Sequence, residues 1–107
     1  MINNLDQVWN NDVANDLVDT LISLRNKTEM KKFIRDVMTE KEIIEVSSRL
    51  LAAKMLTNGE TYTNIVAKTK LSSRTIARIS DWMKKGCGGY ELVIKQHQDH
   101  MLPATAE

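Results

Sequence analysis

The first 24 residues carry an apolar stripe that a lone helix cannot bury. Apolar side chains recur there at three- and four-residue steps, while the positions between them are mostly Asn and Asp. This period is typical of an amphipathic helix with one face in solvent and the other against a packing partner. We therefore expect a long first helix that packs through Leu5, Val8, Trp9, Val13, Leu17, Leu21 and Leu24.

Capping signals define the next two helices. Thr28 can cap a second helix, and Thr39-Glu40-Lys41-Glu42 is a capping box that opens a third. Asn58-Gly59 is a suitable stop for the third helix. The apolar residues of this third helix wrap around more than one side, which predicts a central position: Ile43, Ile44, Val46, Leu50, Leu51, Ala53, Met55 and Leu56.

Three more helices complete the predicted fold. Thr61 can cap a fourth helix that ends near Thr69, and Ser72 can cap a fifth that runs to about Lys85. The run Gly86-Cys87-Gly88-Gly89 ends the fifth helix, and a sixth begins near Tyr90. The sequence thus predicts an all-α fold of six helices in a single domain over residues 1–107, with a loose tail over residues 99–107.

Composition limits the class of protein. With 107 residues and a hydrophobic fraction of 42%, the chain can build a core, although a monomer of this size has little margin. No apolar run approaches the length of a membrane span, and the N-terminus lacks the pattern of a signal peptide. Cys87 is the only cysteine, which rules out an internal disulfide. We expect a cytoplasmic protein that has no membrane partner.

The near-neutral net charge of +1 hides an uneven distribution. Residues 1–26 carry four aspartates against one arginine, a net charge of −3. Residues 60–95 carry seven basic side chains against three acidic ones, a net charge of +4. A basic segment suits a phosphate backbone. Ordinary solvated charge is an equally good explanation on these grounds alone.

Residues 61–85 have the pattern of a helix-turn-helix. This motif needs two short helices locked at a fixed angle by apolar residues at set places. Ile65 and Val66 lie on the first helix, Leu71 falls in the turn, and Ile76 and Ile79 share the inner face of the second. A helical hairpin inside any small bundle is the alternative reading of the same spacing.

The outer face of the second helix carries candidate DNA contacts. Arg74 can pair with guanine, and short polar side chains near the helix start allow close approach to base edges or phosphates. Lys84 and Lys85 can hold a flanking phosphate, and Thr63, Asn64 and Lys68 offer contacts from the first helix of the motif. The full candidate set is Thr63, Asn64, Lys68, Ser72, Ser73, Arg74, Thr75, Ala77, Arg78, Lys84 and Lys85.

Two residues favour a different function. Lys70 occupies a turn position where glycine usually supplies a positive φ. Asp81 places a negative charge on the outer face, although it can pair with Arg78 or Lys85 and orient them. Both features leave open a dimeric protein-interaction module that does not bind specific DNA.

The chain resembles the Trp repressor family, particularly its shorter branch known from Gram-positive bacteria. The resemblance implies an intertwined, all-helical homodimer that regulates transcription, most often as a repressor, at a palindromic DNA site. It runs from about Leu21 to Gln96, through residues 33–36, 38–42, 48–50, 58–62, 71–80 and 88–90.

The family's tryptophan pocket is only partly kept. Thr39, Arg49 and Arg78 match residues that surround the ligand in those repressors. Ile79 replaces a glycine that makes room for the ligand, and Trp82 replaces a small serine. L-tryptophan is therefore not expected as the effector. We hypothesise that Trp82 fills the indole space from within; the alternative is a plain core residue.

The sequence offers no support for catalysis or for a bound cofactor. It contains no glycine-rich phosphate loop, nucleophile signature or paired catalytic carboxylates. His97 and His100 are spaced for metal binding, but no further ligand is placed to complete a site. We therefore expect a protein that is not an enzyme and binds no metal.

Overall fold

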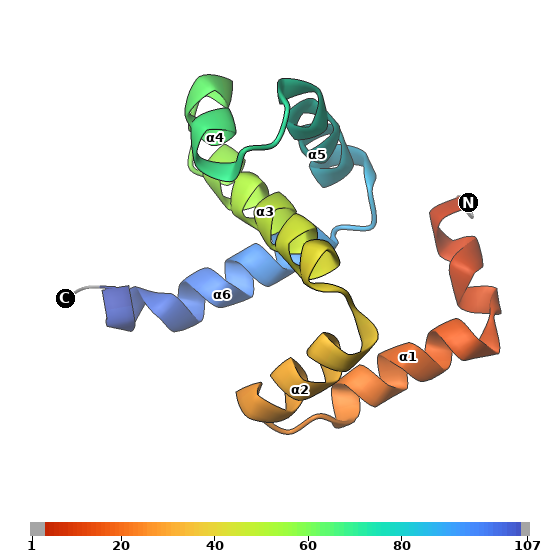
Figure 1. Ribbon diagram of the computed structural model, residues 1–107. Coiled ribbons are helices and arrows are strands. Elements are labelled where there is room, and N and C mark those ends of the chain that lie inside the picture. The colour runs from red at the N-terminus through yellow and green to blue at the C-terminus, as the bar shows by residue number, and fades with distance from the viewer. Residues whose placement is uncertain (1–3, 106–107) are drawn as a thin grey trace. The chain divides into compact units, whose positions relative to one another are not determined.

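In the computed structural model, helices are the only regular secondary structure of residues 4–105, as the sequence predicts (Figure 1). The structure describes the backbone of residues 4–105 and the side chains of residues 7–97. A 3-10 helix, η1 (Asn4–Asn10), precedes six α-helices. These are α1 (Asp12–Ser23), α2 (Lys27–Val37), α3 (Glu40–Thr57), α4 (Tyr62–Thr69), α5 (Ser73–Lys85) and α6 (Gly89–Thr105).

The chain divides into two compact units, Met1–Ile44 and Glu45–Glu107. No described helix is long and apolar enough to cross a membrane. The helix α6 extends through Thr105, so the described part of the expected tail continues that helix, and residues 106 and 107 lie outside the description.

Asn11 interrupts the long first helix that the sequence predicted. The Asn11 Oδ1 accepts hydrogen bonds from the backbone N–H groups of Val13 at 2.8 Å and Ala14 at 3.1 Å, and so caps α1. The Asn15 side chain donates to the carbonyl of Trp9 at 2.6 Å. The prediction of one continuous helix was therefore wrong at Asn11, because asparagine side chains compete for backbone groups that an unbroken helix would use.

The start of α2 also differs from the prediction. Asn26, rather than Thr28, caps this helix, and its Oδ1 accepts from the Glu29 N–H at 2.9 Å. Glu29 reaches back to accept from the Arg25 N–H at 2.9 Å. Thr28 lies two residues inside the helix start, where its hydroxyl cannot take the N-cap role.

The remaining caps agree with the sequence. The Thr39 N–H donates to Glu42 at 2.8 Å and the Glu42 N–H donates to Thr39 Oγ1 at 3.1 Å, which is the predicted capping box. Gly59 has a φ of +79° just beyond α3, as expected for a helix-ending glycine.

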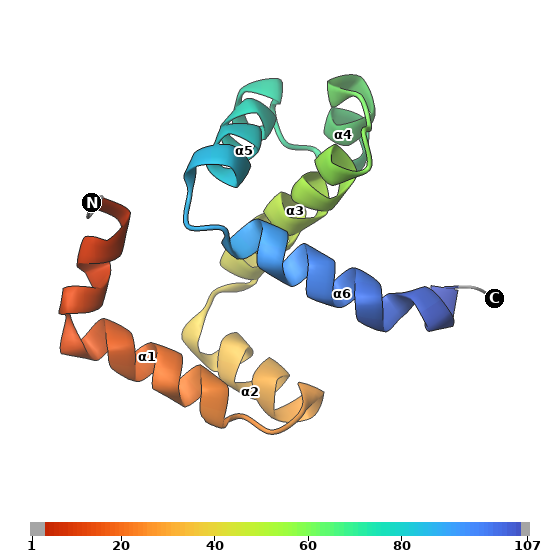
Figure 2. The same cartoon turned by 180° about the vertical axis from the view of Figure 1, so that it is seen from behind.

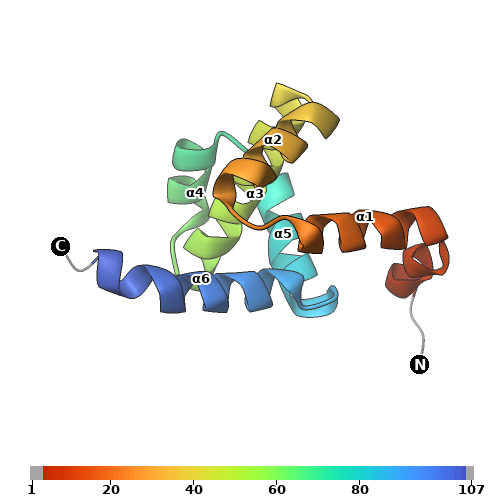
Figure 3. The same cartoon turned by 90° about the horizontal axis from the view of Figure 1, so that it is seen from below.

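The second unit contains the buried core. Small side chains of α3, Ala52 and Ala53, are fully buried, together with Ile65 of α4 and Ile76 of α5. Ile79 and Ile94 complete the cluster, each 3% exposed. Figure 2 shows α4 and α5 side by side next to α3, with α6 passing across α3. Figure 3 shows the turn that joins α5 to α6. The core therefore holds four helices of this unit together.

The first unit and the start of α3 leave many apolar side chains uncovered. Neither α1 nor α2 contains a buried residue. Val13 is 78% exposed and Ile22 is 76% exposed, and Ile44 and Val46 on α3 are also exposed. The stripe predicted to need a packing partner thus finds little cover within its own unit.

Candidate nucleic-acid interface

Side-chain caps begin both helices of the α4–α5 pair, residues 61–85. Thr61 caps α4 by accepting from the Asn64 N–H at 3.2 Å. Ser72 caps α5 by accepting from the Thr75 N–H at 3.1 Å. Both caps are those the sequence predicted, and each satisfies a backbone donor that the helix itself leaves free.

Thr69 ties the end of α4 to the turn. Its side chain is buried, and its hydroxyl donates to the Ile65 carbonyl at 2.7 Å while accepting from the Leu71 N–H at 3.2 Å. Lys70 follows with φ +65° and ψ 11°, in the left-handed region. The sequence placed Lys70 at a glycine-like turn position, and the backbone confirms that placement.

The two faces of α5 separate as the helical period predicts. Ile76 and Ile79 are buried against the core, and Met83 is half-buried next to them. On α4, Ile65 is fully buried, while Tyr62 is 41% exposed and stays outside the core cluster. The outward positions of α5 are exposed and mainly basic or small: Ser73, Arg74, Ala77, Arg78, Asp81, Lys84 and Lys85.

Hydroxyl groups at the start of α5 are partly used by the cap. The Ser72 hydroxyl donates to Thr75 Oγ1 at 3.0 Å in addition to accepting the Thr75 N–H. Thr75 keeps its own hydroxyl proton, and Ser73 and Arg74 are exposed at the helix start. Three of the four predicted contacts therefore remain available, while Ser72 mainly fixes the helix end.

Ion pairing distinguishes the two lysines at the end of α5. Lys85 Nζ lies 3.4 Å from Asp81 Oδ1, which is one of the pairings the sequence allowed. Among the described side chains, no ion pair holds Lys84. Because both members of the Asp81–Lys85 pair are largely exposed, we expect it to orient Lys85 rather than to stabilise the fold.

The candidate contacts of α4 lie partly toward α3. The Asn64 side chain donates to Glu60 at 3.4 Å, and Asn64 and Lys68 line an open groove with Leu51 and Met55 of α3. Thr63 is exposed and is not part of this groove.

Four of the five predicted effector residues meet in one pocket. Arg49, Arg78, Ile79 and Trp82 line a depression of about 420 Å³, which also includes Thr75 and Tyr90. Thr39 lies in the first unit, where its hydroxyl serves the capping box. Tyr90 is a lining residue that the site prediction omitted, although it belongs to the Gly88-Gly89-Tyr90 segment that contributed to the family resemblance.

Trp82 lies against the backbone at the end of α5 and is 51% exposed. A Cβ at Gly86 would come within 2.6 Å of the Trp82 carbonyl oxygen and 3.0 Å of its ring atom Cε3. Gly86 therefore makes room for this ring. In the single chain, Trp82 is not a core residue, and a depression remains beside it.

No group of three or more metal-binding side chains occurs within the part of the chain whose side chains are described. His97 is exposed, and the side chain of His100 lies outside that part.

Comparisons with known proteins identify similar chains. The family described as Trp repressor protein matches residues 13–98. The uncharacterised protein YerC of Bacillus subtilis is 33% identical over 78 residues, which is 73% of this chain and 75% of YerC.

Two solved structures share the fold. A TrpR-like protein from Eubacterium eligens has a TM-score of 0.77 and 34% identity, over 80% of this chain and 89% of that one. A candidate Trp repressor from Staphylococcus aureus has a TM-score of 0.81 and 28% identity, over 87% of this chain and 93% of that one.

The left-handed backbone at Lys70 leads to a stability prediction. We expect Lys70→Gly to raise the free energy of unfolding by up to about 1 kcal/mol, because relief of the αL strain exceeds the entropic cost of glycine. Lys68→Gly, inside α4, should lower it by about 1 kcal/mol. Urea denaturation of both variants checks this, and a destabilised Lys70→Gly protein would contradict it.

Proposed function

Because this chain belongs to the Trp repressor family, we propose that it is a sequence-specific DNA-binding regulator that acts as a repressor. The observation that supports this most is the outer face of α5, which is exposed and mainly basic above a buried inner face. Such a helix can enter a major groove while its own core holds it at a fixed angle.

Individual residues take different roles in this proposal. Arg74, at the first turn of α5, can reach a guanine edge with two parallel hydrogen bonds. Lys84 and Lys85, one helix length away, can contact flanking phosphates, with Asp81 orienting Lys85. The free N–H groups at the start of α5 favour a phosphate at that end.

The two residues that favoured a protein-interaction module, Lys70 and Asp81, do not support it in the structure. Lys70 adopts the left-handed conformation that the turn needs, so it does not exclude a tight helix-turn-helix. Asp81 pairs with Lys85 and does not stand as an isolated negative charge on the outer face. DNA binding therefore remains the function that the geometry favours.

We expect Arg74→Ala to weaken binding to DNA selected from genomic fragments by about 1–3 kcal/mol and to relax sequence preference. Lys54→Ala removes the same charge from α3 and should change affinity far less. Fluorescence anisotropy on matched and mismatched sites measures both effects. Unchanged affinity and preference in Arg74→Ala would exclude Arg74 as a base-reading residue.

The active species in this proposal is a homodimer. The exposed apolar side chains of α1 and of the start of α3 need cover that their own units do not supply. A second copy of the chain would supply it and would present two α5 helices to a palindromic site.

Leu17→Asp should convert the dimer to a monomer, because a carboxylate would replace an apolar contact at the interface. Leu17 is 48% exposed in the single chain, so the substitution adds no buried charge there. Asp16→Asn, on the neighbouring polar position, serves as the control and should remain dimeric. Analytical ultracentrifugation decides the question, and a monomeric wild-type protein would refute the dimer.

Free tryptophan is not the effector in this proposal. Ile79 is nearly fully buried where the family ligand needs a glycine, and Trp82 stands on the rim of the same depression. DNA binding should therefore not depend on that amino acid.

Calorimetric titration with L-tryptophan should give no heat at micromolar concentration, and micromolar L-tryptophan should leave the DNA affinity unchanged. The double variant Ile79→Gly, Trp82→Ser opens the pocket. Its heat of L-tryptophan binding is therefore compared with that of the unmodified protein. Micromolar binding to the unmodified protein would overturn this part of the proposal.

A further inference from the structure

A second pocket lies on the opposite flank of α5 from the depression that contains Trp82. It occupies about 480 Å³ between α3, α5 and α6, and it shares no lining residue with that depression. We call it the α3–α5–α6 pocket. Its apolar lining comes from Leu56, Met83 and Ile94, one residue from each of the three helices. A volume of several hundred Å³ suits a small organic ligand.

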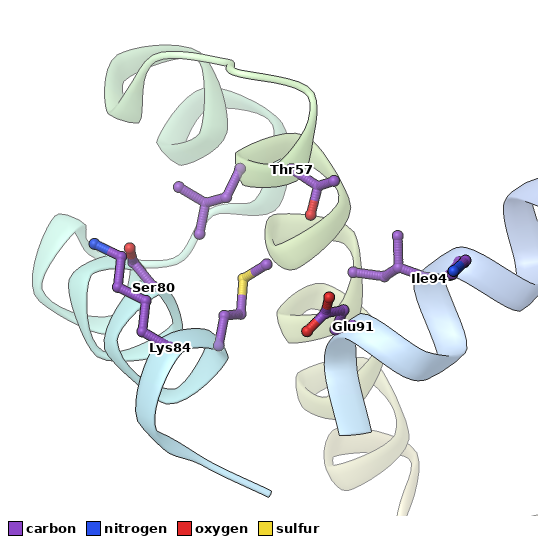
Figure 4. Close-up of a pocket in the computed structure, with 8 residues that line it drawn as sticks. Thr57, Ser80, Lys84, Glu91 and Ile94 are labelled. Carbon is purple, nitrogen blue, oxygen red and sulfur yellow. The ribbon is translucent and has the colours of Figure 1, made fainter. Parts of the chain in front are cut away.

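Charged side chains surround this apolar lining. Lys84 of α5 and Glu91 and Lys95 of α6 all line the pocket. Figure 4 shows Ser80 and Lys84 on one side, with Thr57, Glu91 and Ile94 across from them. No ion pair occupies Lys84, Glu91 or Lys95 among the described side chains. The pocket thus offers positive and negative groups that are not satisfied by one another.

We propose that the α3–α5–α6 pocket binds a small zwitterion with an apolar body, and that this ligand weakens DNA binding through Lys84. The apolar body would cover Leu56, Met83 and Ile94. The anionic end would meet Lys84, and the cationic end would meet Glu91 on the opposite wall. A simple anion would bring a second negative charge next to Glu91, and a simple cation would bring a further positive charge next to Lys84 and Lys95.

The hydroxyl groups of the pocket fit this assignment. The Thr57 hydroxyl donates to the Ala53 carbonyl at 2.9 Å, so it can only accept from a ligand, as an ammonium group requires. The Ser80 hydroxyl makes no hydrogen bond with the described residues and lies on the side of Lys84. It can donate to a carboxylate there.

Lys84 connects the pocket to the proposed DNA contact, and this half of the proposal rests on the proposed function. A carboxylate that engages Lys84 competes with a DNA phosphate for the same ammonium group. Ligand and DNA then lower each other's affinity by the same factor. The neighbouring Lys85 does not line the pocket, so the carboxylate of the ligand would engage Lys84 and leave Lys85 as it is.

Methyl NMR on the full chain without DNA tests the pocket. The probes are L-leucine and L-phenylalanine, each compared with the amine that lacks its carboxylate and the acid that lacks its ammonium. At least one zwitterion should shift the Met83 and Ile94 methyl signals with a Kd of about 1 mM or tighter. Its two analogues should bind about tenfold more weakly or worse. Unshifted methyls, or equal affinity for all three compounds, would overturn the proposal.

A matched pair of variants separates specific binding from general charge effects. Glu91→Gln should weaken binding of the zwitterion about tenfold while leaving the acid analogue unaffected or tighter. Glu45→Gln removes the same charge from an exposed position on α3 outside the pocket and should change neither. Equal weakening of both compounds by Glu91→Gln would mean that Glu91 only supports the fold.

Anisotropy with selected DNA tests the coupling. The zwitterion should weaken DNA binding, and Lys84→Gln should both lower the salt slope by about one and abolish the ligand's effect on DNA. Pocket binding with unchanged DNA affinity would overturn the coupling. A protein that binds the zwitterion but no DNA would refute the proposed function and its regulation, while the pocket assignment, measured without DNA, would stand.

Discussion

The buried cluster that α3, α4, α5 and α6 share is the interaction on which the rest of the second unit depends. Ala52 and Ala53 of α3 are fully buried in the same cluster as Ile76 and Ile79 of α5. Ile65 and Ile94 bring α4 and α6 to the same cluster. Because interiors are close-packed, a larger residue at either alanine would overpack and strain this cluster.

The turn before α5 converts this packing into a fixed orientation. Thr69 is buried and bonded in both directions, so the end of α4 and the start of the turn cannot move independently. In the same turn, the backbone of Lys70 adopts the left-handed conformation, which costs about 1 kcal/mol. A helix that reads base edges needs this rigidity, because loss of register by an ångström breaks its hydrogen bonds.

The parts of the fold that depend on local chemistry could be predicted from the sequence. The caps at Thr39, Thr61 and Ser72 each involve a hydroxyl and a backbone group three residues away. The same reasoning failed at Asn11, where no break in the first helix was predicted, and at Asn26, because Thr28 was predicted as the cap. Both asparagines nevertheless accept from backbone N–H groups within three residues. The two faces of α5 were predictable because residues three and four positions apart lie on the same face of an α-helix.

The sites were less accessible to sequence reasoning because each draws on several helices. Ser80 and Glu91 are separated by eleven residues and belong to different helices, and nothing local indicates that they line one pocket. Tyr90 joins Arg49 and Trp82 for the same reason. Ala52, omitted from the predicted core, is fully buried in a cluster to which α4, α5 and α6 also contribute.

The placement of both pockets beside α5 has a consequence for regulation under the proposed function. One face of α5 packs in the core and the opposite face would contact DNA, so a ligand on either flank can act on the helix without displacing the core. Trp82 stands on one flank, next to Arg78, and Lys84 belongs to the other. Trp82 lines the first depression without filling it, while the second pocket includes Lys84 at the end of the surface proposed to contact DNA. Under the two proposals, α5 would not respond to tryptophan on its first flank and would respond to a different ligand on its second.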